Sequence, residues 1–421
     1  MEGWKTTRLD EACQFINGLW KGEEPPFVRV GVIRNTNFAK DGYLDDTDIA
    51  YLDVEAKKFA KRRLQFGDII LEKSGGGPKQ PVGRVVLFDK TQGDFSFSNF
   101  TAAIRLKEPK ELDPAYLHRY LHWFYLCGRT EAMQSHSTGI RNLNGDAYKA
   151  IGVDYPPLRE QRRIVAILDE AFEAIATAKA NIEKNQRSSA DLYESALDLA
   201  LSHRGSGYNE TTLGAEVDLL PGYAFPSKGY VAANAGVRLL RGDNIMQGYL
   251  RWDDAKGWPA DDVTAYSRFA LREGDVVLAM DRPWVKAGLK RAQIASSDLP
   301  CLLLQRTARL RPGPRLRMDF LLHLVGSRLF SRHLLGLQTG IGVPHISGKQ
   351  IECFAFMLPP LSAQAVVACR LDDVLQSTAR LAEIYERKGL ALDELKKSLL
   401  HQAFTGQLTA KATDQQVAEV A

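Results

Sequence analysis

The sequence predicts a mixed α/β protein in which two globular domains alternate with two long helices, and the helices pair as an antiparallel coiled coil about an approximate two-fold axis. Three observations lead to this prediction. Short motifs recur in the same order in the two halves of the 421-residue chain. Each half begins with short β-favouring runs separated by glycine and proline. Each half ends with about forty residues that are almost free of glycine and proline and carry apolar side chains at helical spacing.

The recurrence is an internal repeat with a nearly constant offset. Gly67–Leu71 returns as Gly274–Leu278, an offset of 207, and Thr138–Ile140 returns as Thr339–Ile341, an offset of 201. Four further matches join Leu9 with Leu213, Gly42–Leu44 with Gly248–Leu250, Pro156–Leu158 with Pro359–Leu361, and Leu168–Asp169 with Leu371–Asp372. Six matches in one order are hard to attribute to chance, so we infer that one unit occurs twice.

The globular part of each copy has the pattern of a mixed α/β domain. Val28–Ile33, Asp68–Leu71 and Arg84–Phe88 favour strands. Asp113 followed by Pro114 is typical of a helix cap with proline at the first helical position, and the residues after it have apolar side chains at helical spacing.

The second part of each copy predicts a long helix. No glycine or proline occurs from Arg159 to Ser202, and only Gly389 interrupts the corresponding stretch of the second copy. The predicted apolar seams are Ile164, Leu168, Phe172, Ile175, Ile182, Leu192, Ala196 and Leu199 in the first helix, and Val367, Leu371, Val374, Leu375, Leu381, Ile384, Leu392, Leu395 and Leu399 in the second. Forty-odd residues make helices of about 60 Å, which are too long to bury within a small domain. Pairing with each other is the most economical way to cover both seams.

These features divide the chain into five parts. We expect a first domain at 1–155, a spacer helix at 156–205, a second domain at 206–357, a second spacer helix at 358–410, and a tail at 411–421.

Composition narrows the class of protein. Hydrophobic residues make up 45% and charged residues 25%, which is typical of folded domains. No apolar run reaches the ~18 residues of a membrane span, and the first residues lack the layout of a signal peptide, so we expect a cytoplasmic protein. The five cysteines form no C-x-x-C pair, which argues against a zinc site. The net charge is only +4, so any affinity for DNA must come from local basic patches or be shared with a partner.

The boundaries of the long helices carry a resemblance to a known family. The segments Tyr155–Val165 and Leu399–Leu408 resemble the start and the end of a spacer helix in the specificity subunits of type I restriction–modification enzymes, the HsdS family. Gly67–Gly75 and Ser137–Ile140 support the resemblance, which covers essentially the whole chain. The second helix start, Leu358–Ala365, departs from the pattern because it lacks the glutamate and the basic residues of the first.

The resemblance implies a non-catalytic subunit. Members of the family contain two target-recognition domains, each of which reads one half of a bipartite target in double-stranded DNA. Their helices set the unread gap and bind two methyltransferase subunits, and two restriction subunits can join the complex. The resemblance therefore implies no cofactor in this chain, with S-adenosylmethionine in the methyltransferase and ATP and magnesium in the restriction subunit. It implies no membrane partner.

Candidate DNA-contacting residues lie in the glycine-rich loops of both domains. Arginine and lysine favour guanine, and asparagine and glutamine favour adenine, so these residue types are the candidates. They are Lys73, Ser74, Lys79, Gln80, Arg84, His136, Arg141 and Asn142 in the first domain, and Arg282, Trp284, Lys286, Lys290, Arg291 and His345 in the second. The loops differ between the copies, which suits two readers of different half-sites.

Candidate partner-contacting residues lie at the ends of the helices. The resemblance points to Arg159, Gln161, Arg162, Gln364 and Phe404 as contacts to the methyltransferase subunits. If the helices act as spacers, inserting one helical turn into residues 170–190 should lengthen the tolerated gap by about one base pair or more.

Two other functions remain open from the residues alone. One is a self-contained DNA adenine methyltransferase, because Asp154–Leu158 superficially resembles an Asp-Pro-Pro-Tyr motif, although the order is wrong. The other is a coiled-coil adaptor that binds proteins and no DNA. We predict neither catalytic residues nor a metal site, because the sequence contains no phosphate-binding loop, nucleophile elbow or H-E-x-x-H motif.

Overall fold

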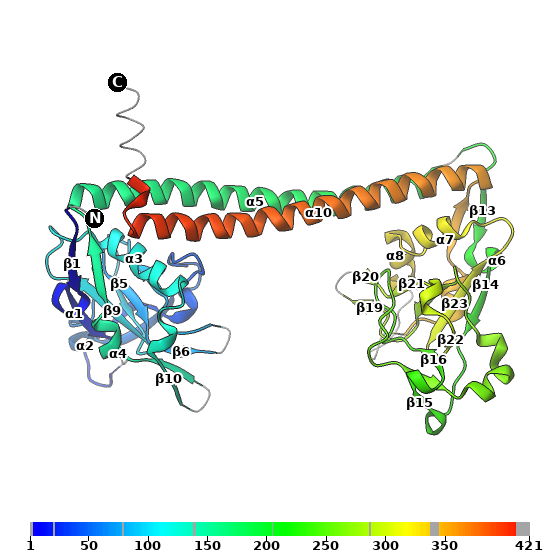
Figure 1. Ribbon diagram of the computed structural model, residues 1–421, viewed down its shortest axis with the longest axis horizontal. Helices are drawn as coiled ribbons and strands as arrows, with labels where there is room; N and C mark the ends of the chain where they lie inside the picture. The colour runs from blue at the N-terminus through cyan, green and yellow to red at the C-terminus, as the bar shows by residue number, and fades with distance from the viewer. Residues whose placement is uncertain are drawn as a thin grey trace. The chain divides into compact units, whose positions relative to one another are not determined.

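The computed structural model describes residues 3–19, 22–77, 80–137, 140–203, 205–285, 288–336 and 345–409, the side chains of His136 and Ser137 excepted. The chain forms two compact units (Figure 1). Unit 1 contains Met1–Ile182 and Arg387–Ala421, and unit 2 contains Glu183–Glu386. Each unit therefore holds one globular domain and a part of each long helix, so the boundary between the units cuts the helices and does not follow the five-part division of the sequence.

Domain 1, the globular part of unit 1, is built on two sheets. The antiparallel sheet has the order β2–β9–β5–β7, with β2 at Cys13–Asn17, β9 at Thr101–Leu106, β5 at Ile69–Glu72 and β7 at Val85–Leu87. The second sheet has the order β4–β3–β8, with β4 at Ala50–Glu55, β3 at Phe27–Ile33 and β8 at Phe95–Phe97, and only the β3–β8 pair is parallel. Smaller pairings join β1 (Lys5–Arg8) with β12 (Gly152–Tyr155), and β10 (Gln134–Ser137) and β11 (Ile140–Leu143) with β6 (Ser74–Gly76). The helices are α1 (Leu9–Ala12), α2 (Ala56–Ala60), α3 (Pro114–Leu126) and α4 (Gly145–Lys149).

Helix α3 begins where the sequence predicts it. The Asp113 carboxylate accepts hydrogen bonds from the backbone N–H groups of Ala115 (3.0 Å) and Tyr116 (3.4 Å), and Pro114 occupies the first turn. These bonds satisfy donors that a helix start otherwise leaves unpaired. The apolar face of α3, which includes Tyr116 and Leu117, is buried in a core shared with the sheet and the long helices.

Domain 2, the globular part of unit 2, repeats this plan. Its antiparallel sheet has the order β14–β23–β18–β21, with β14 at Val217–Pro221, β23 at Thr307–Pro312, β18 at Val276–Ala279 and β21 at Arg291–Gln293. A second sheet has the order β15–β17–β16–β22, with β15 at Val231–Ala232, β17 at Lys256–Trp258, β16 at Val237–Leu240 and β22 at Cys301–Leu303. The remaining strand pairs are β13 (Asn209–Thr212) with β24 (Ala355–Leu358), and β19 (Trp284–Val285) with β20 (Gly288–Leu289). The helices are α6 (Leu213–Glu216), α7 (Met318–Leu324), α8 (Arg328–Gly336) and α9 (Gly348–Glu352).

One close backbone contact shows how faithfully the plan is repeated. A Cβ atom at Gly18 would lie 1.9 Å from the carbonyl oxygen of Ser98, and one at Gly222 would lie 1.9 Å from that of Leu304. No side chain fits in either place, so glycine is required at both. The repeat found in the sequence is thus a repeat of topology, down to individual backbone contacts.

The two long helices are α5 (Leu158–Ser202) and α10 (Leu361–Phe404), and α10 continues through Gly389 without a break. In unit 1 the start of α5, at Ile164, shares a core with the end of α10, at Leu400. In unit 2 the end of α5, at Leu201, shares a core with Leu371 near the start of α10. In each unit the two helices therefore run antiparallel, as the sequence predicts (Figure 1).

The predicted seam is wrong in detail in the second half of α5. Leu192 and Leu199 were assigned to the seam but are 56% and 73% exposed, whereas Leu197 and Leu201 are buried. The cause is the neighbouring domain, because Leu197 and Leu201 pack against α7 and the sheet of domain 2. The buried face of α5 is therefore determined by domain 2 as well as by α10. The predicted seam residues of α10 that are exposed are Leu375, Leu381, Ile384 and Leu395.

Among the described residues, no helix is long and apolar enough to cross a membrane.

Candidate nucleic-acid interface

In domain 1 three candidate residues meet where strand β6 follows β5. Ser74 Oγ donates a 2.6 Å hydrogen bond to Asn142 Oδ1 on β11, and Lys73 Nζ donates to Asn17 Oδ1 at 3.0 Å. Asn35 Nδ2 donates to the Ser74 carbonyl oxygen at 2.7 Å. Burial lowers the pKa of Lys73. The structure therefore brings Lys73, Ser74 and Asn142 together and adds Asn35, which the sequence did not single out.

Arg84 has a structural role in domain 1. Its guanidinium donates to both carboxylate oxygens of Glu72, at 2.7 and 2.9 Å, and to the carbonyl oxygens of Phe38 (3.0 Å) and Asn35 (3.2 Å). The Glu72 carboxylate is buried, so removing either Arg84 or Glu72 would leave the other charge without a partner and would destabilise the domain. The Gln80 amide lies within 3.0 Å of the same guanidinium. A guanidinium engaged in this way has few donors left, and a contact of Arg84 with DNA stays a prediction.

The other candidates of domain 1 lie on or near the β10–β11 hairpin. Arg141 donates to Gln134 Oε1 at 3.3 Å across the two strands. His136 lies on β10, but its side chain is outside the described part of the structure, as is the whole of Lys79. Their contact with DNA stays a prediction.

Domain 2 contains a polar cavity of about 770 Å³ on its loops. The basic residues that line it are Arg241, Lys256, Arg282, Arg306 and His345, and the acidic ones are Asp243 and Asp281. Arg306 forms an ion pair with Asp281 at 2.8 Å, and His345 Nδ1 hydrogen-bonds to the same carboxylate. The sequence singled out Arg282 and His345 but missed Arg241, Lys256 and Arg306, because these come from segments far apart in the chain. An alignment of the two copies would have drawn attention to Arg306, which stands opposite Phe100 of domain 1.

Three further candidates of domain 2 are turned inward. Trp284 packs against the core of the domain, Lys290 is buried, and the Arg291 guanidinium lies against Gly326. Burial lowers the pKa of Lys290 and of Arg291, and nearby Tyr193 and Glu194 of α5 partly oppose this for Arg291. Arg291 thus lies between domain 2 and α5, where it has a structural role. It does not lie on an exposed loop. Lys286 lies outside the described residues.

The two helix starts are held by equivalent glutamines. Gln161 Oε1 accepts from the Asp113 N–H at 2.8 Å, while its Nε2 donates to the carbonyl oxygens of Glu111 and Pro156, both at 2.8 Å. Gln364 accepts from the Arg317 N–H and donates to the carbonyl oxygens of Arg315 and Pro359, also at 2.8 Å each. Both side chains are 0% exposed. They join each helix to its own domain, and the expectation that they contact a partner needs correction because neither side chain reaches the surface.

The other partner candidates divide into buried and exposed. Phe404 is buried against Tyr116, Tyr120 and Trp123 of α3, so it anchors the end of α10 within unit 1 rather than presenting a ring to a partner. Arg159 is exposed, and the Arg162 side chain is 67% exposed while lying 3.5 Å from Asp113. Only these two arginines remain accessible for a partner contact, which stays a prediction.

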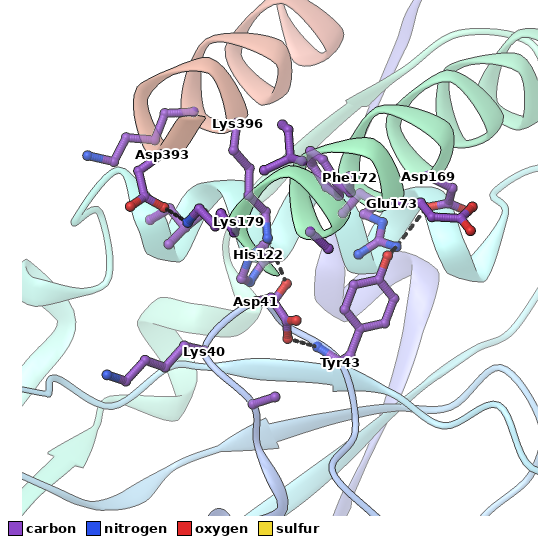
Figure 2. Close-up of a pocket in the computed structure, with 16 residues that line it drawn as sticks. Lys40, Asp41, Tyr43, His122, Asp169, Phe172, Glu173, Lys179, Asp393 and Lys396 are labelled. Atoms are coloured by element: carbon purple, nitrogen blue, oxygen red, sulfur yellow. Dashed lines mark hydrogen bonds and ion pairs between the residues drawn. The ribbon is translucent and has the colours of Figure 1, made fainter. Parts of the chain in front are cut away.

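Each domain also contacts its long helix through an aspartate. In unit 1, the Arg119 guanidinium donates to Asp169 of α5 at 2.7 Å and to the Tyr43 hydroxyl oxygen at 2.6 Å. Arg119, Asp169 and Tyr43 line a cavity of about 880 Å³ between domain 1 and the helices. Tyr43 and Asp169 are labelled in Figure 2. In unit 2, the equivalent residues are His323 and Asp372, whose side chains lie 3.0 Å apart.

Several charged side chains of the unit 1 cavity hold the domain and the two helices together. Lys179 of α5 forms an ion pair with Asp393 of α10, and Lys396 donates to the Asp41 carbonyl oxygen at 3.4 Å (Figure 2). We therefore interpret this cavity as the junction of the domain with its helices. No group of three or more histidine, cysteine or carboxylate side chains that could hold a metal occurs in the described part of the chain.

Comparison with known proteins finds similar sequences among specificity subunits of type I restriction enzymes. A family model described as the type I restriction modification DNA specificity domain matches residues 1–185. The EcoAI specificity subunit of Escherichia coli is 36% identical over 42% of this chain, and the match spans only 30% of that protein. The MjaVIII specificity subunit of Methanocaldococcus jannaschii is 25% identical over 97% of this chain and 94% of that protein.

Solved structures share the fold over the whole chain. The HsdS subunit from Thermoanaerobacter tengcongensis has a TM-score of 0.63 at 20% identity, covering 97% of this chain and 98% of that one. A chain from a structural study of complex assembly in the type I R-M system has a TM-score of 0.77 at 20% identity, covering 97% and 99%. The chain is thus similar in sequence to specificity subunits of type I restriction enzymes, and it shares the fold of the solved HsdS structure over nearly its whole length.

Proposed function

We propose that this chain selects the DNA sequence on which a type I restriction–modification complex acts, and that it carries no catalytic centre itself. Domain 1 and domain 2 each read one half of a bipartite target in double-stranded DNA, and α5 and α10 set the unread gap. Two methyltransferase subunits, and two restriction subunits where the system cleaves DNA, bind this chain in the cytoplasm. S-adenosylmethionine belongs to the methyltransferase, and ATP and magnesium belong to the restriction subunit.

One observation carries the proposal: the two copies attach their domain to the long helix in the same way, whereas their loops differ. We call the shared sheets, helices and helix attachments the frame. Gln161 and Gln364 make the same three hydrogen bonds in the two copies. By contrast, the loop contact that is Ser74–Asn142 in domain 1 is Asp281–His345 in domain 2. A protein that reads two different half-sites requires this combination, because the frame fixes the position of the loops while the loops determine the bases.

Selection from a pool of random-sequence duplexes tests the proposal. The full chain, alone and with the methyltransferase subunit, should enrich a motif of two short conserved segments separated by an unconserved gap of fixed length. Enrichment of no motif would contradict the proposal and would favour a coiled-coil adaptor. Binding of S-adenosylmethionine by the purified chain alone would favour a self-contained methyltransferase instead.

A further inference from the structure

The backbone of domain 2 is strained at two arginines of one cavity. Among the described residues, the non-glycine residues with positive φ are Arg282 (44°) and Arg306 (65°), and both line the cavity of domain 2. A left-handed conformation is unfavourable for an arginine, and such conformations persist mainly where the surrounding structure and a function require them. In domain 1 the position of Arg282 is held by Gly75, whose φ is 103°, so the strain belongs to domain 2 alone.

The guanidinium of Arg306 is both oriented and accessible. Its Nη1 lies 2.8 Å from Asp281 Oδ2, and the side chain is 69% exposed. The Asp281 carboxylate also hydrogen-bonds to His345 Nδ1, which limits how far it can turn. A guanidinium held by one of its nitrogens still presents other N–H groups, and the O6 and N7 atoms of guanine are a pair of acceptors that arginine can bind with two hydrogen bonds.

The equivalent position in domain 1 is Phe100. Thr101 Oγ1 donates to the Ser98 carbonyl oxygen at 2.7 Å, and Thr307 Oγ1 donates to that of Leu304 at 2.5 Å, so Phe100 and Arg306 occupy the same position in the same turn. The Phe100 carbonyl oxygen accepts from the Lys73 N–H at 3.0 Å, and that of Arg306 accepts from the Met280 N–H at 2.8 Å. The fold therefore presents an exposed ring in one copy and an oriented guanidinium in the other.

We propose that Arg306 is a specificity-determining residue of domain 2 that reads a guanine in the major groove, with Asp281 as its positioning residue. The inference rests on the proposed function, since it names the base that one of the two readers selects. Domain 1, with Phe100, Asn35 and Asn142 around the same loops, has no arginine at this place and selects its bases by other contacts.

Arg306→Gly is the decisive variant because glycine adopts positive φ without strain. The thermal unfolding temperature should therefore stay the same or rise, which keeps a folding failure from imitating a loss of function. In selection from the random-duplex pool, the preference for guanine at one base pair of one half-site should fall by on the order of tenfold to a hundredfold. All other positions of the motif should be unchanged.

Arg306→Lys and Arg317→Ala are the companion variants. Lysine keeps the charge and can still bind guanine, but it lacks the planar fork, so Arg306→Lys should weaken the same preference less than Arg306→Gly does while keeping the salt dependence of binding. Arg317 also pairs with an aspartate, Asp319 at 2.6 Å, but lies outside the cavity, so Arg317→Ala should retain the wild-type motif.

Two results would overturn the inference and leave the proposed function standing. One is that the preference for guanine at every base pair of the wild-type motif stays the same in Arg306→Gly. The other is binding by Arg306→Gly that is weakened equally for all sequences, with a salt slope reduced by about one, because this would make Arg306 a phosphate contact. If the wild-type chain enriches no split motif, the proposed function itself fails.

Discussion

At the scale of single residues, the buried glutamines explain why the helix start is a recognisable motif. The sequence identifies Gln161 and Gln364 as equivalent, but it cannot show what they bind, because their partners are backbone groups of Glu111 and Arg315, about fifty positions away. A polar residue near a helix start is ordinarily exposed, which is why a partner contact was the natural prediction. The fold buries it because the helix must be attached to the preceding domain.

Gln161→Leu should destabilise unit 1. Leucine fits the volume approximately but leaves the Asp113 N–H and two carbonyl oxygens without partners, and each buried unpaired group costs about 1–3 kcal/mol. We expect the free energy of unfolding, measured in urea, to fall by about 3 kcal/mol or more. Arg162→Ala, one position along on the exposed side, should change it by less than about 0.5 kcal/mol. Equal stabilities of the two variants would refute the anchoring role.

We expect the buried histidines to make the stability of the protein sensitive to acid. Burial lowers the pKa of His118 to about 3, and burial lowers the pKa of His122 well below its usual range. Burial also lowers the pKa of His323, with Asp372 opposing the shift. Because these pKa values are lower in the folded chain than in the unfolded one, the unfolded chain binds more protons below about pH 6.5. The stability is therefore complete above that pH and falls as the pH falls.

Urea unfolding measured between about pH 7 and pH 5 checks this expectation. Each histidine that is neutral in the folded chain and protonated in the unfolded chain should contribute a slope of up to about 1.4 kcal/mol per pH unit. A free energy of unfolding that stays constant or increases over this range would show that the histidines are protonated in the fold.

At the scale of elements, the long helices were the most predictable feature. About forty residues with no proline, with at most one glycine (Gly389) and with regular apolar spacing strongly favour a helix, and α5 and α10 lie within the predicted ranges. The buried face was less predictable. Leu197 and Leu201 are buried by domain 2, whereas Leu192 and Leu199 remain exposed, and both pairs fit helical spacing equally well. Only the packing of the domain on the helix decides between the two faces.

A change in helix length should change the gap in the DNA target. Inserting four residues after Ile182 in α5 and four after Glu386 in α10 keeps both sets of domain contacts and adds about 6 Å to each helix. We expect the tolerated gap to lengthen by one to two base pairs, about 3.4 Å each, with both half-site motifs unchanged. Selection from the random-duplex pool provides the measurement, and the same insertion in α5 alone serves as the mismatched control. An unchanged gap would refute the spacer role.

At the scale of the whole molecule, the duplication was predictable and the chemistry of the loops was not. Repeated motifs such as Gly67–Leu71 and Gly274–Leu278 locate equivalent strands in the two domains. Of the loop candidates, however, Arg84 pairs with Glu72 inside domain 1, and Arg291 is turned toward Tyr193 and the long helix. A basic residue in a glycine-rich segment looks the same in sequence whether it pairs with a buried carboxylate or faces solvent. The frame follows from local patterns, whereas the direction of each loop side chain depends on long-range contacts.

The central claim is that one chain uses two domains to choose a split DNA sequence. The most direct test is to map methylated adenines in the genome of a cell that contains the methyltransferase subunit, with and without this chain. Our account predicts that methylation appears only with the chain and only at a motif of two segments separated by a fixed gap. Replacing domain 2 by that of a relative should change one segment alone. Methylation that is independent of the chain, or that follows a single continuous motif, would contradict it.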